Sequence, residues 1–304
     1  MLTFAPEYKE RPWGSDRFAS VFSRQVPDGL LGEAWQLGEL EEFHAQVADG
    51  PLAGQYLGDL WRAGKLGGSA TGSFPFLLKW LDTAMPLSVQ VHPNANTCRA
   101  DTSDRSKTEA WYVAHKEEGS CLWAGLKTQT SPEEIVAACE NGKIAELLCQ
   151  LSPEAGELIF IPAGTVHALG SGFLILEVQE PSDTTFRLYD WGRLGLDGKP
   201  RALHLDAGTQ AIDYQRIGPP QQSGQDLSCP AFRMGKVSTE KTYHPEMLRV
   251  FSCAENELVL TNGENRFTLQ KGDIRVAEVS DGPLTLASGS GVLITEGRTF
   301  TEER

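Results

Sequence analysis

The chain has 304 residues, of which 40% are hydrophobic and 22% are charged, and its formal net charge at pH 7 is −14. This balance is typical of a folded globular protein, and the acidic surface argues against nucleic acid or an anionic membrane as a partner, since both require a basic face. We expect no membrane contact, because no apolar run reaches the length of about 18 residues that a membrane span needs.

The N-terminus and the cysteines bear on where the protein works. Residues 1–14 contain no basic segment followed by an apolar one, so we expect no export signal. Six cysteines are scattered along the chain without CxxC spacing. A chain of this size with such cysteines is expected to keep reduced thiols in the cytoplasm.

Short segments bounded by glycine, proline and other turn residues predict a series of strands. These segments cover 77–83, 88–93, 108–115, 156–164 and 172–180. A weak helical pattern covers 52–67. A clearer helix is predicted over 131–148, where Ser131 and Glu134 can form a capping box and Pro132 fits the first helical position. Asn141 and Gly142 leave open whether this segment is one helix or two.

The composition changes after residue 214. Residues 215–230 are rich in glycine, proline and glutamine without periodicity, which predicts a linker. The alternating segments beyond it predict a small antiparallel β unit; they are 255–263, 265–273, 282–288 and 291–297. We therefore expect a mainly β protein with a few helices, divided into a domain over 1–214 that carries the site, a linker over 215–230, and a C-terminal β domain over 231–304.

Candidate metal ligands lie at the ends of the predicted strands. Gln90 and His92 are two residues apart, so a strand places both side chains on one face, and Pro93 ends that strand. Lys107 and Glu109 share a face of the next strand by the same parity. Trp111 follows on that face, but we expect Trp111 and Tyr112 to pack in the core.

The stretch 156–172 breaks a predicted strand into a turn. Gly156, Pro162, Gly164 and His167 follow the spacing G-x5-P-x-G-x2-H, which resembles the second motif of the cupin β-barrel family. In such a turn the glycine permits the backbone geometry that directs the histidine into the mouth of the barrel. One amide oxygen, two imidazoles and one carboxylate would suit a zinc site with an exchangeable position.

Four ordered segments resemble the type I phosphomannose isomerases in their short bacterial form. They are SVQVHPN, KTEAWY, IPAGTVHALGSG and LEVQEPSDTTFRLYDWGR. The resemblance implies a cupin-type antiparallel β-barrel (jelly roll) for the first domain, and the C-terminal domain is expected to be cupin-like or a sandwich. It also implies one zinc ion (Zn2+) per chain and these site residues: Gln90, His92, Glu109 and His167 as metal ligands, Arg187, Lys107 and Glu177 as catalytic residues, and Arg187 and Lys107 as substrate-binding residues.

The implied reaction interconverts mannose 6-phosphate and fructose 6-phosphate through an enediol, so the partner is a small sugar phosphate. The residues leave open whether Arg187 neutralises the phosphate or the enediolate, and whether Glu177 carries the proton. Ser106 replaces a usual glycine, and the loop 94–106 departs from the family pattern, which bears on how substrate fits. The sequence leaves the oligomeric state open.

Two other functions remain open from the residues alone. His92, Glu109 and His167 could form the facial triad of an iron-dependent cupin oxygenase. A non-catalytic sugar-phosphate sensor would keep the pocket without proton transfer. Gln90 and Arg187 favour zinc and a sugar phosphate over the oxygenase. The presence of Arg187, Lys107 and Glu177 together favours the isomerase over the sensor.

Each site residue also has a structural alternative. Arg187 could pair with Asp183 or Asp190 at the surface. Glu177 lies in an apolar run, where a buried structural ion pair is a rival to a catalytic role. The remaining histidines have no ligand-spaced partner, and we expect them at the surface or in ordinary hydrogen bonds; they are His44, His115, His204 and His244.

Overall fold

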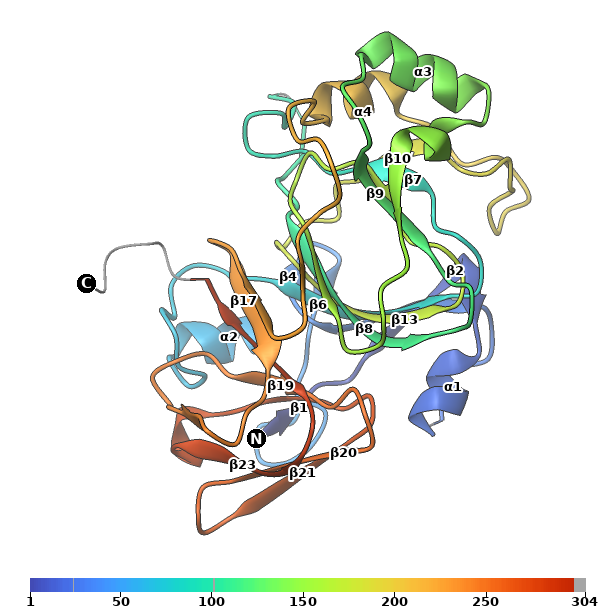
Figure 1. The fold of residues 1–304 in the computed structure, drawn as a ribbon. Helices are drawn as coiled ribbons and strands as arrows, with labels where there is room; N and C mark the ends of the chain where they lie inside the picture. The colour runs from blue at the N-terminus through green and yellow to red at the C-terminus, as the bar shows by residue number, and fades with distance from the viewer. Residues whose placement is uncertain (24, 101, 298–304) are drawn as a thin grey trace.

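The computed structural model describes residues 1–23, 25–100 and 102–297. Its elements are mostly strands, and every ladder between them is antiparallel, with a few short helices at the periphery (Figure 1). The expected mainly β fold is therefore confirmed. The end of the predicted C-terminal domain, 298–304, lies outside the described residues.

Two antiparallel sheets face each other in the first part of the chain. The larger has seven strands, in the order β15 (Gln222–Ser223), β11 (Leu158–Ile161), β8 (Glu109–Lys116), β13 (Phe173–Gln179), β6 (Leu77–Thr83), β3 (Leu31–Leu37) and β2 (Glu7–Ser15). The smaller has five, in the order β10 (Leu148–Leu151), β9 (Leu122–Leu126), β12 (His167–Ala168), β7 (Val89–Val91) and β14 (Phe186–Tyr189). The five strands expected from the sequence all form.

Strand β13 shows why its sequence is a nearly continuous apolar run. Phe173 and Ile175 pack between the two sheets, in a cluster that also holds side chains of β9. Leu174, Leu176 and Val178 point the other way and pack against the C-terminal strands and helix α2 (Leu57–Arg62). A strand buried on both faces needs apolar residues at successive positions rather than at alternate ones.

Helices cover the outer face of the five-stranded sheet. α3 (Pro132–Glu140), the 3-10 turn η1 (Ile144–Leu147) and α4 (Leu205–Ala211) lie at the top of Figure 1. Ile135 and Cys139 of α3 and Ala211 of α4 pack against Val89 and Val91 of β7. Because side chains alternate along a strand, burying Val89 and Val91 on this face turns Gln90 toward the opposite sheet.

The C-terminal part forms a second pair of antiparallel sheets. One has the order β1 (Leu2–Thr3), β22 (Ile274–Val276), β19 (Val250–Ser252), β24 (Val292–Glu296), β17 (Phe232–Lys236) and β16 (Asp226–Ser228). The other has the order β18 (Thr242–Tyr243), β23 (Leu284–Gly289), β20 (Glu257–Thr261) and β21 (Arg266–Gln270). A separate apolar cluster fills the space between them.

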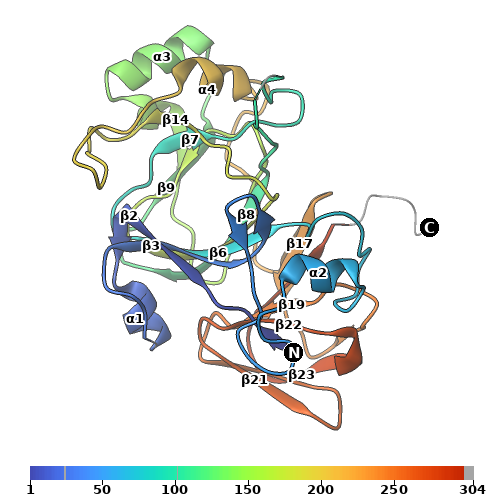
Figure 2. The same cartoon turned by 180° about the vertical axis from the view of Figure 1, so that it is seen from behind.

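Contacts between the two parts are more extensive than a linker predicts. The N-terminal strand β1 pairs with β22 of the C-terminal sheet, and the N-terminus lies among those strands in Figures 1 and 2. The segment 215–230 contains β15, which joins the seven-stranded sheet, and β16, which joins the C-terminal one. The domain boundaries near 214 and 231 stay a prediction.

The helix expectations are met in part. The weak pattern over 52–67 yields only α2, six residues long. The segment 131–148 divides into α3 and η1, with Asn141 as the C-cap of α3, so two short elements form. The remaining short elements are α1 (Arg17–Phe22), η2 (Val279–Asp281) and the pair β4 (Glu39–Leu40) with β5 (Phe43–His44).

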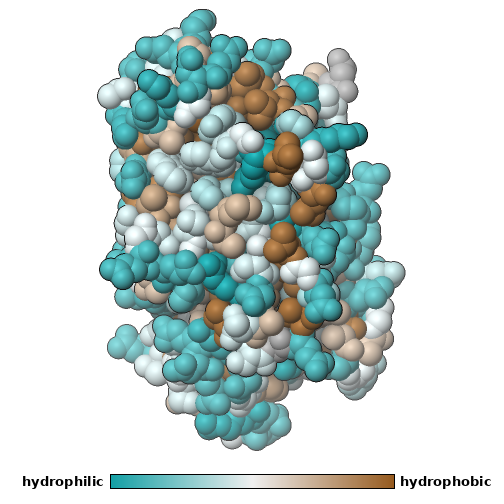
Figure 3. All heavy atoms as spheres, turned by 90° about the vertical axis from the view of Figure 1, so that its right-hand side faces the viewer, coloured by the Kyte–Doolittle hydropathy of each residue, from teal (hydrophilic) through white to brown (hydrophobic). Residues whose placement is uncertain are grey.

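One face of the molecule is largely polar. Figure 3 shows the side on the right of Figure 1 as mostly hydrophilic, with its apolar side chains gathered in a narrow band. Among the helices in the described ranges, none is both long enough and apolar enough to cross a membrane.

The capping box of α3 gives a test of local stability. The Ser131 hydroxyl accepts from the Glu134 backbone N–H at 3.2 Å, and the Glu134 carboxylate accepts from the Ser131 N–H at 2.7 Å. Ser131→Ala should therefore lower the free energy of unfolding by about 1 kcal/mol in urea titrations. Ser288→Ala, at an exposed strand position, is the control and should change it by less than about 0.5 kcal/mol. Equal effects of the two substitutions would contradict the capping role.

Candidate active site

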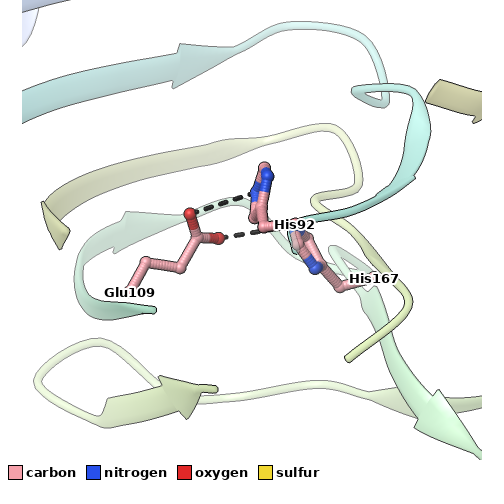
Figure 4. A group of neighbouring side chains, drawn as sticks. All are labelled: His92, Glu109 and His167. Carbon is pink, nitrogen blue, oxygen red and sulfur yellow. Dashed lines mark ion pairs between the residues drawn. The ribbon is translucent and has the colours of Figure 1, made fainter. Parts of the chain in front are cut away.

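Three buried side chains converge between the facing sheets. His92 Nε2 lies 3.3 Å from Glu109 Oε2, and His167 Nε2 lies 3.3 Å from Glu109 Oε1. One donor atom from each residue lies within 4.8 Å of the others. Figure 4 shows both imidazoles turned toward the carboxylate. Three of the expected ligands, distant in sequence, therefore meet at one point.

Strand register brings these residues together. His167 of β12 pairs with Gln90 of β7, and Gln90 pairs in turn with Arg187 of β14, so the three form one row across the five-stranded sheet. His92 follows directly after β7, and Glu109 opens β8 on the opposite sheet. Both sheets must therefore be in place before the cluster is complete.

The turn before His167 depends on a glycine. Gly164 has a φ of +87°, a region that residues with a side chain rarely adopt, and an added Cβ would lie 3.0 Å from the Asp213 Cβ. The Gly164 N–H donates to the His92 carbonyl oxygen at 2.8 Å. The turn that delivers one histidine is thus hydrogen-bonded to the backbone of the other.

Backbone carbonyls fix the orientation of both imidazoles. His92 Nδ1 lies 2.9 Å from the Thr184 carbonyl oxygen, and His167 Nδ1 lies 2.9 Å from that of Thr165. Because a carbonyl can only accept, each Nδ1 carries the proton and each Nε2 presents its lone pair to the cluster. Burial, followed by the charge of Lys107, lowers the pKa of His92 to about 3, and burial also lowers the pKa of His167. Both rings are neutral, as metal ligation requires.

Glu109 completes a donor set that suits a divalent metal ion. Burial opposes its ionisation, but the charge of Lys107 holds the pKa of Glu109 well below its usual range. Its buried Oε1 has no hydrogen-bond partner among the described residues. Tetrahedral zinc ligands at about 2.1 Å from the ion lie about 3.4 Å apart, close to the two 3.3 Å separations around Glu109. These residues therefore fit zinc.

Gln90 and Lys107 border the cluster. Gln90 Nε2 lies 3.3 Å from His167 Nε2, so rotation of the amide by half a turn would present its oxygen there. The Lys107 ammonium lies 2.5 Å from Glu109 Oε2 and 3.1 Å from His92 Nε2. The structure thus brings together the four expected ligands and one of the expected catalytic cations.

A cavity of about 600 Å³ opens beside this cluster. Gln90 and Lys107 line it, and so do Glu177 and Arg187. The other charged side chains of its wall were not expected from the sequence; they are Glu10, Arg11, Glu33, Lys79, Asp183, Asp197 and Arg201. Such a polar cavity is suited to a small, highly hydroxylated and charged ligand.

Glu177 belongs to a buried charged network. Its Oε1 lies 2.9 Å from Lys79 Nζ, and its Oε2 accepts from the Trp111 indole N–H at 2.7 Å. The Trp111 ring also contacts His167, with centroids 5.4 Å apart. Tyr112 packs in the core as expected. Trp111 is buried as well, but it also connects a metal-site histidine to Glu177 in the cavity wall.

Arg187 is held by backbone groups rather than by an acid. Its Nη1 donates to the Ala202 carbonyl oxygen at 2.9 Å, and no described carboxylate lies within ion-pair distance of it. The alternative pairing with Asp190 is therefore wrong, because Asp190 binds Arg193 and Arg201 instead. Burial, followed by repulsion from Arg201, lowers the pKa of Arg187.

His204 has a positioning role that sequence spacing did not reveal. Its Nδ1 accepts from the Arg187 backbone N–H at 3.1 Å, and its own N–H donates to the Arg187 carbonyl oxygen at 2.7 Å. This reciprocal pair extends the edge strand β14 and fixes the residue that carries Arg187. The expectation of an ordinary, satisfied histidine is met, but its partner is a candidate catalytic residue.

The loop 94–106, apart from residue 101, is tied to the chain that follows β13. The Ser106 hydroxyl donates to Glu180 Oε2 at 2.8 Å, and the Arg105 backbone N–H donates to the Thr184 hydroxyl oxygen at 3.1 Å. Thr184 also supplies the carbonyl that orients His92. The serine at 106 therefore anchors this loop beside the metal cluster.

Comparison with known proteins gives a consistent result. Residues 1–120 match the family model described as the catalytic domain of type I phosphomannose isomerase. The chain is 33% identical to a mannose-6-phosphate isomerase of Bacillus subtilis over 288 residues, which cover 90% of this chain and 91% of the relative. It is 36% identical to a mannose-6-phosphate isomerase of Streptococcus mutans over 292 residues, covering 90% of each.

Solved structures agree at the level of the fold. The crystal structure of mannose 6-phosphate isomerase from Bacillus subtilis superposes with a TM-score of 0.83 at 24% identity and covers 97% of this chain and 99% of that one. A putative mannosephosphate isomerase from Archaeoglobus fulgidus gives a TM-score of 0.75 at 19% identity, covering 97% of each chain.

The buried acid Glu33 in the cavity wall predicts a pH dependence of stability. Burial raises its pKa, but the charges of Lys79 and Arg11 outweigh burial and lower it to about 2 from 4.5. The stabilisation is therefore complete above about pH 4.5 and is lost as the pH falls toward 2. Glu33→Gln should cost about 3 kcal/mol of unfolding free energy at pH 7 and less at pH 3.5, measured by urea denaturation.

The exposed Glu118 provides the control for this experiment. Glu118→Gln should change the unfolding free energy by less than about 0.5 kcal/mol at both pH values. A cost of Glu33→Gln that stays the same or grows as the pH falls would contradict the assigned direction.

Proposed function

The chain belongs to the type I phosphomannose isomerase family, and we propose that its reaction takes place in the cavity beside His92, Glu109 and His167. The protein is an aldose–ketose isomerase that interconverts mannose 6-phosphate and fructose 6-phosphate. The observation that carries the location is the buried cluster of two neutral imidazoles and one carboxylate at the edge of a polar cavity.

Zinc is the proposed metal, held one per chain by Gln90, His92, Glu109 and His167. Two nitrogen donors, one carboxylate and one amide oxygen suit zinc, and the carbonyl groups behind both imidazoles keep Nε2 free to bind it. When bound, zinc supplies a Lewis acid that favours negative charge on substrate oxygens. The protein contributes the buried, prearranged donors.

Arg187 is proposed to stabilise the anion that forms during isomerisation. Five cationic side chains line the cavity, and Arg187 is the one without a carboxylate within ion-pair distance among the described residues. Its register with Gln90 places it at the metal end of the cavity. A fixed, unpaired guanidinium there can stabilise charge on an enediolate without reorganising during the reaction.

Glu177 is proposed to move the proton between C2 and C1. An acid–base group must be held within hydrogen-bonding reach of the carbon that loses its proton. Lys79 and Trp111 fix the Glu177 carboxylate in the cavity wall, and Trp111 relates its position to His167. The same network makes Glu177 both structurally important and suitably placed for chemistry.

Lys107 is proposed to assist at the metal end. Its ammonium contacts two donor atoms of the cluster and also lines the cavity. Bound zinc would supply the positive charge that Lys107 gives Glu109, and Lys107 would then be available to hold a substrate oxygen in the cavity that it lines. Lys107 thereby supports Arg187 in binding the anionic substrate.

The isomerase family excludes the two competing interpretations. An iron-dependent oxygenase could use the same histidines and carboxylate, and a sensor could use the same cavity, but the relatives over nine tenths of the chain are isomerases.

For the cellular setting we propose the cytoplasm, which the six free cysteines support.

Metal dependence follows from the cluster and can be measured directly. A coupled assay with mannose 6-phosphate should show turnover in the protein as purified, its loss after chelation, and its return on addition of one equivalent of zinc. His167→Ala should fail to recover activity at that stoichiometry, because it removes one ligand. His44→Ala, at an exposed position on the short strand β5, is the matched control and should recover fully. Full turnover in the chelated protein would contradict the metal site.

The role of Arg187 predicts a loss of turnover without a loss of metal. Arg187→Ala should lower kcat about 100- to 1,000-fold, the usual effect of removing one prearranged group that stabilises a developing anion. Zinc content by elemental analysis should remain one per chain. Arg233→Ala, at an exposed position of β17, should leave kcat unchanged. An Arg187→Ala enzyme with full zinc and undiminished kcat would rule out the proposed role.

A further inference from the structure

The loop between β14 and α4 forms one wall of the active-site cavity. It projects from the five-stranded sheet, on the right of Figure 1 and on the left of Figure 2. Residues 195–197 and Arg201 of this loop line the cavity. An isolated antiparallel bridge pairs Leu194 with Pro200 and holds together the two ends of the segment 195–199.

The base of this loop concentrates positive charge. Asp190 Oδ1 accepts from Arg193 Nη2 at 2.8 Å and from Arg201 Nη2 at 2.5 Å, while Arg187 lies close enough to Arg201 for their repulsion to affect its pKa. Three guanidinium groups thus surround one carboxylate, and two of them, Arg187 and Arg201, line the cavity. Elsewhere in the wall, Arg11 pairs with Glu33 and Lys79 with Glu177.

Arg201 is fixed on two sides. Its Nε and Nη2 both donate to the Asp190 carboxylate, a two-point contact that sets the plane of the guanidinium. That plane lies over the Trp13 ring, with the guanidinium carbon 4.9 Å from the ring centroid. Among the described residues, Nη1 has no hydrogen-bond partner, so a donor is left for a ligand in the cavity.

The two arginines reach the cavity from different elements. Arg187 pairs in register with Gln90, next to the metal cluster, and its Nη1 donates to the carbonyl of Ala202, the residue after Arg201. Arg201 is reached from the loop, beside Leu196 and Asp197. Arg193 does not line the cavity, because its donors bind Asp190 and the Pro86 carbonyl.

We propose that Arg201 binds the phosphate group of the substrate and thereby sets the preference for phosphorylated sugars. The inference rests on the proposed function of the cavity. A phosphate monoester carries a charge of about −1.5 to −2 near neutral pH and accepts hydrogen bonds from guanidinium groups, and the fixed Arg201 side chain has its Nη1 donor free for such an oxygen among the described residues. When Arg201 binds the phosphate, Arg187 is available to contact the oxygen atoms on the reacting carbons.

The test compares Arg201→Gln with wild type in steady-state kinetics on mannose 6-phosphate, using zinc-loaded protein. Because Arg201 binds a group that does not react, KM should rise about 10- to 100-fold while kcat stays within about 3-fold. Inorganic phosphate, added as a competitive inhibitor, should show a comparable rise in its inhibition constant. Arg233→Gln is the control and should change neither constant.

A conservative variant keeps the test decisive. Arg201→Lys retains a cation beside Asp190 and should raise KM by a smaller factor, about 3- to 10-fold, because lysine cannot reproduce the two-point geometry. If Arg201→Gln does not fold, the KM and the phosphate inhibition constant of Arg201→Lys test the proposal in its place. Turnover by wild type confirms the reaction independently of Arg201.

Two results would overturn the proposal. Unchanged KM and phosphate inhibition in either folded Arg201 variant would show that the phosphate binds elsewhere. A fall in kcat with an unchanged phosphate inhibition constant would show that Arg201 only positions the loop. Absence of turnover in zinc-loaded wild type would instead contradict the proposed function itself.

Discussion

The buried carboxylate of Glu109 is the constraint around which the site is built. A carboxylate removed from water is costly unless positive charge or hydrogen-bond donors surround it. The facing sheets provide His92 and His167 with their lone pairs toward it, and Lys107 supplies the positive charge. Carbonyl groups of Thr184 and Thr165 fix the imidazoles in the form that binds a metal rather than the form that donates to the carboxylate. Because two lone pairs do not stabilise a carboxylate, Lys107 provides the compensating charge, and a cation bound between the imidazoles and Glu109 would add to it.

Charge is distributed unevenly over the rest of the cavity. On the seven-stranded sheet the charged residues are paired, Lys79 with Glu177 and Arg11 with Glu33, so that wall is rigid and nearly neutral. On the opposite sheet and its loop, Arg187 and Arg201 line the cavity together with Asp183 and Asp197. Arg187 has no carboxylate within ion-pair distance among the described residues, and Arg201 keeps one nitrogen free of Asp190. Donors for an anionic substrate are therefore provided by these two arginines, although the overall charge of the chain is −14.

Much of this could be predicted from sequence where the signal is local. The turn Pro162–Gly164 needs a glycine at positive φ, so its sequence is recognisable. The apolar run 172–180 is likewise recognisable as a strand or a buried helix segment. The network of Lys79 with Glu177 could not be predicted, because it arises from the pairing register of β6 with β13. The two strands within 215–230 escaped for a related reason: each forms by pairing with a distant strand, while its own composition resembles a loop. Short sequence motifs therefore predict the metal ligands, whereas the residues that surround the ligands depend on the pairing register of distant strands.

The zinc site can be tested directly by a crystal structure of the zinc-loaded protein with anomalous diffraction at the zinc edge. We expect one strong peak per chain, bonded to both His Nε2 atoms, a Glu109 oxygen and the Gln90 amide oxygen at about 2.0–2.2 Å. The peak should disappear in crystals of chelated protein. A fully active enzyme whose zinc peak lies elsewhere, or whose Glu109 carboxylate stays paired to Lys107 with no metal beside it, would contradict the account.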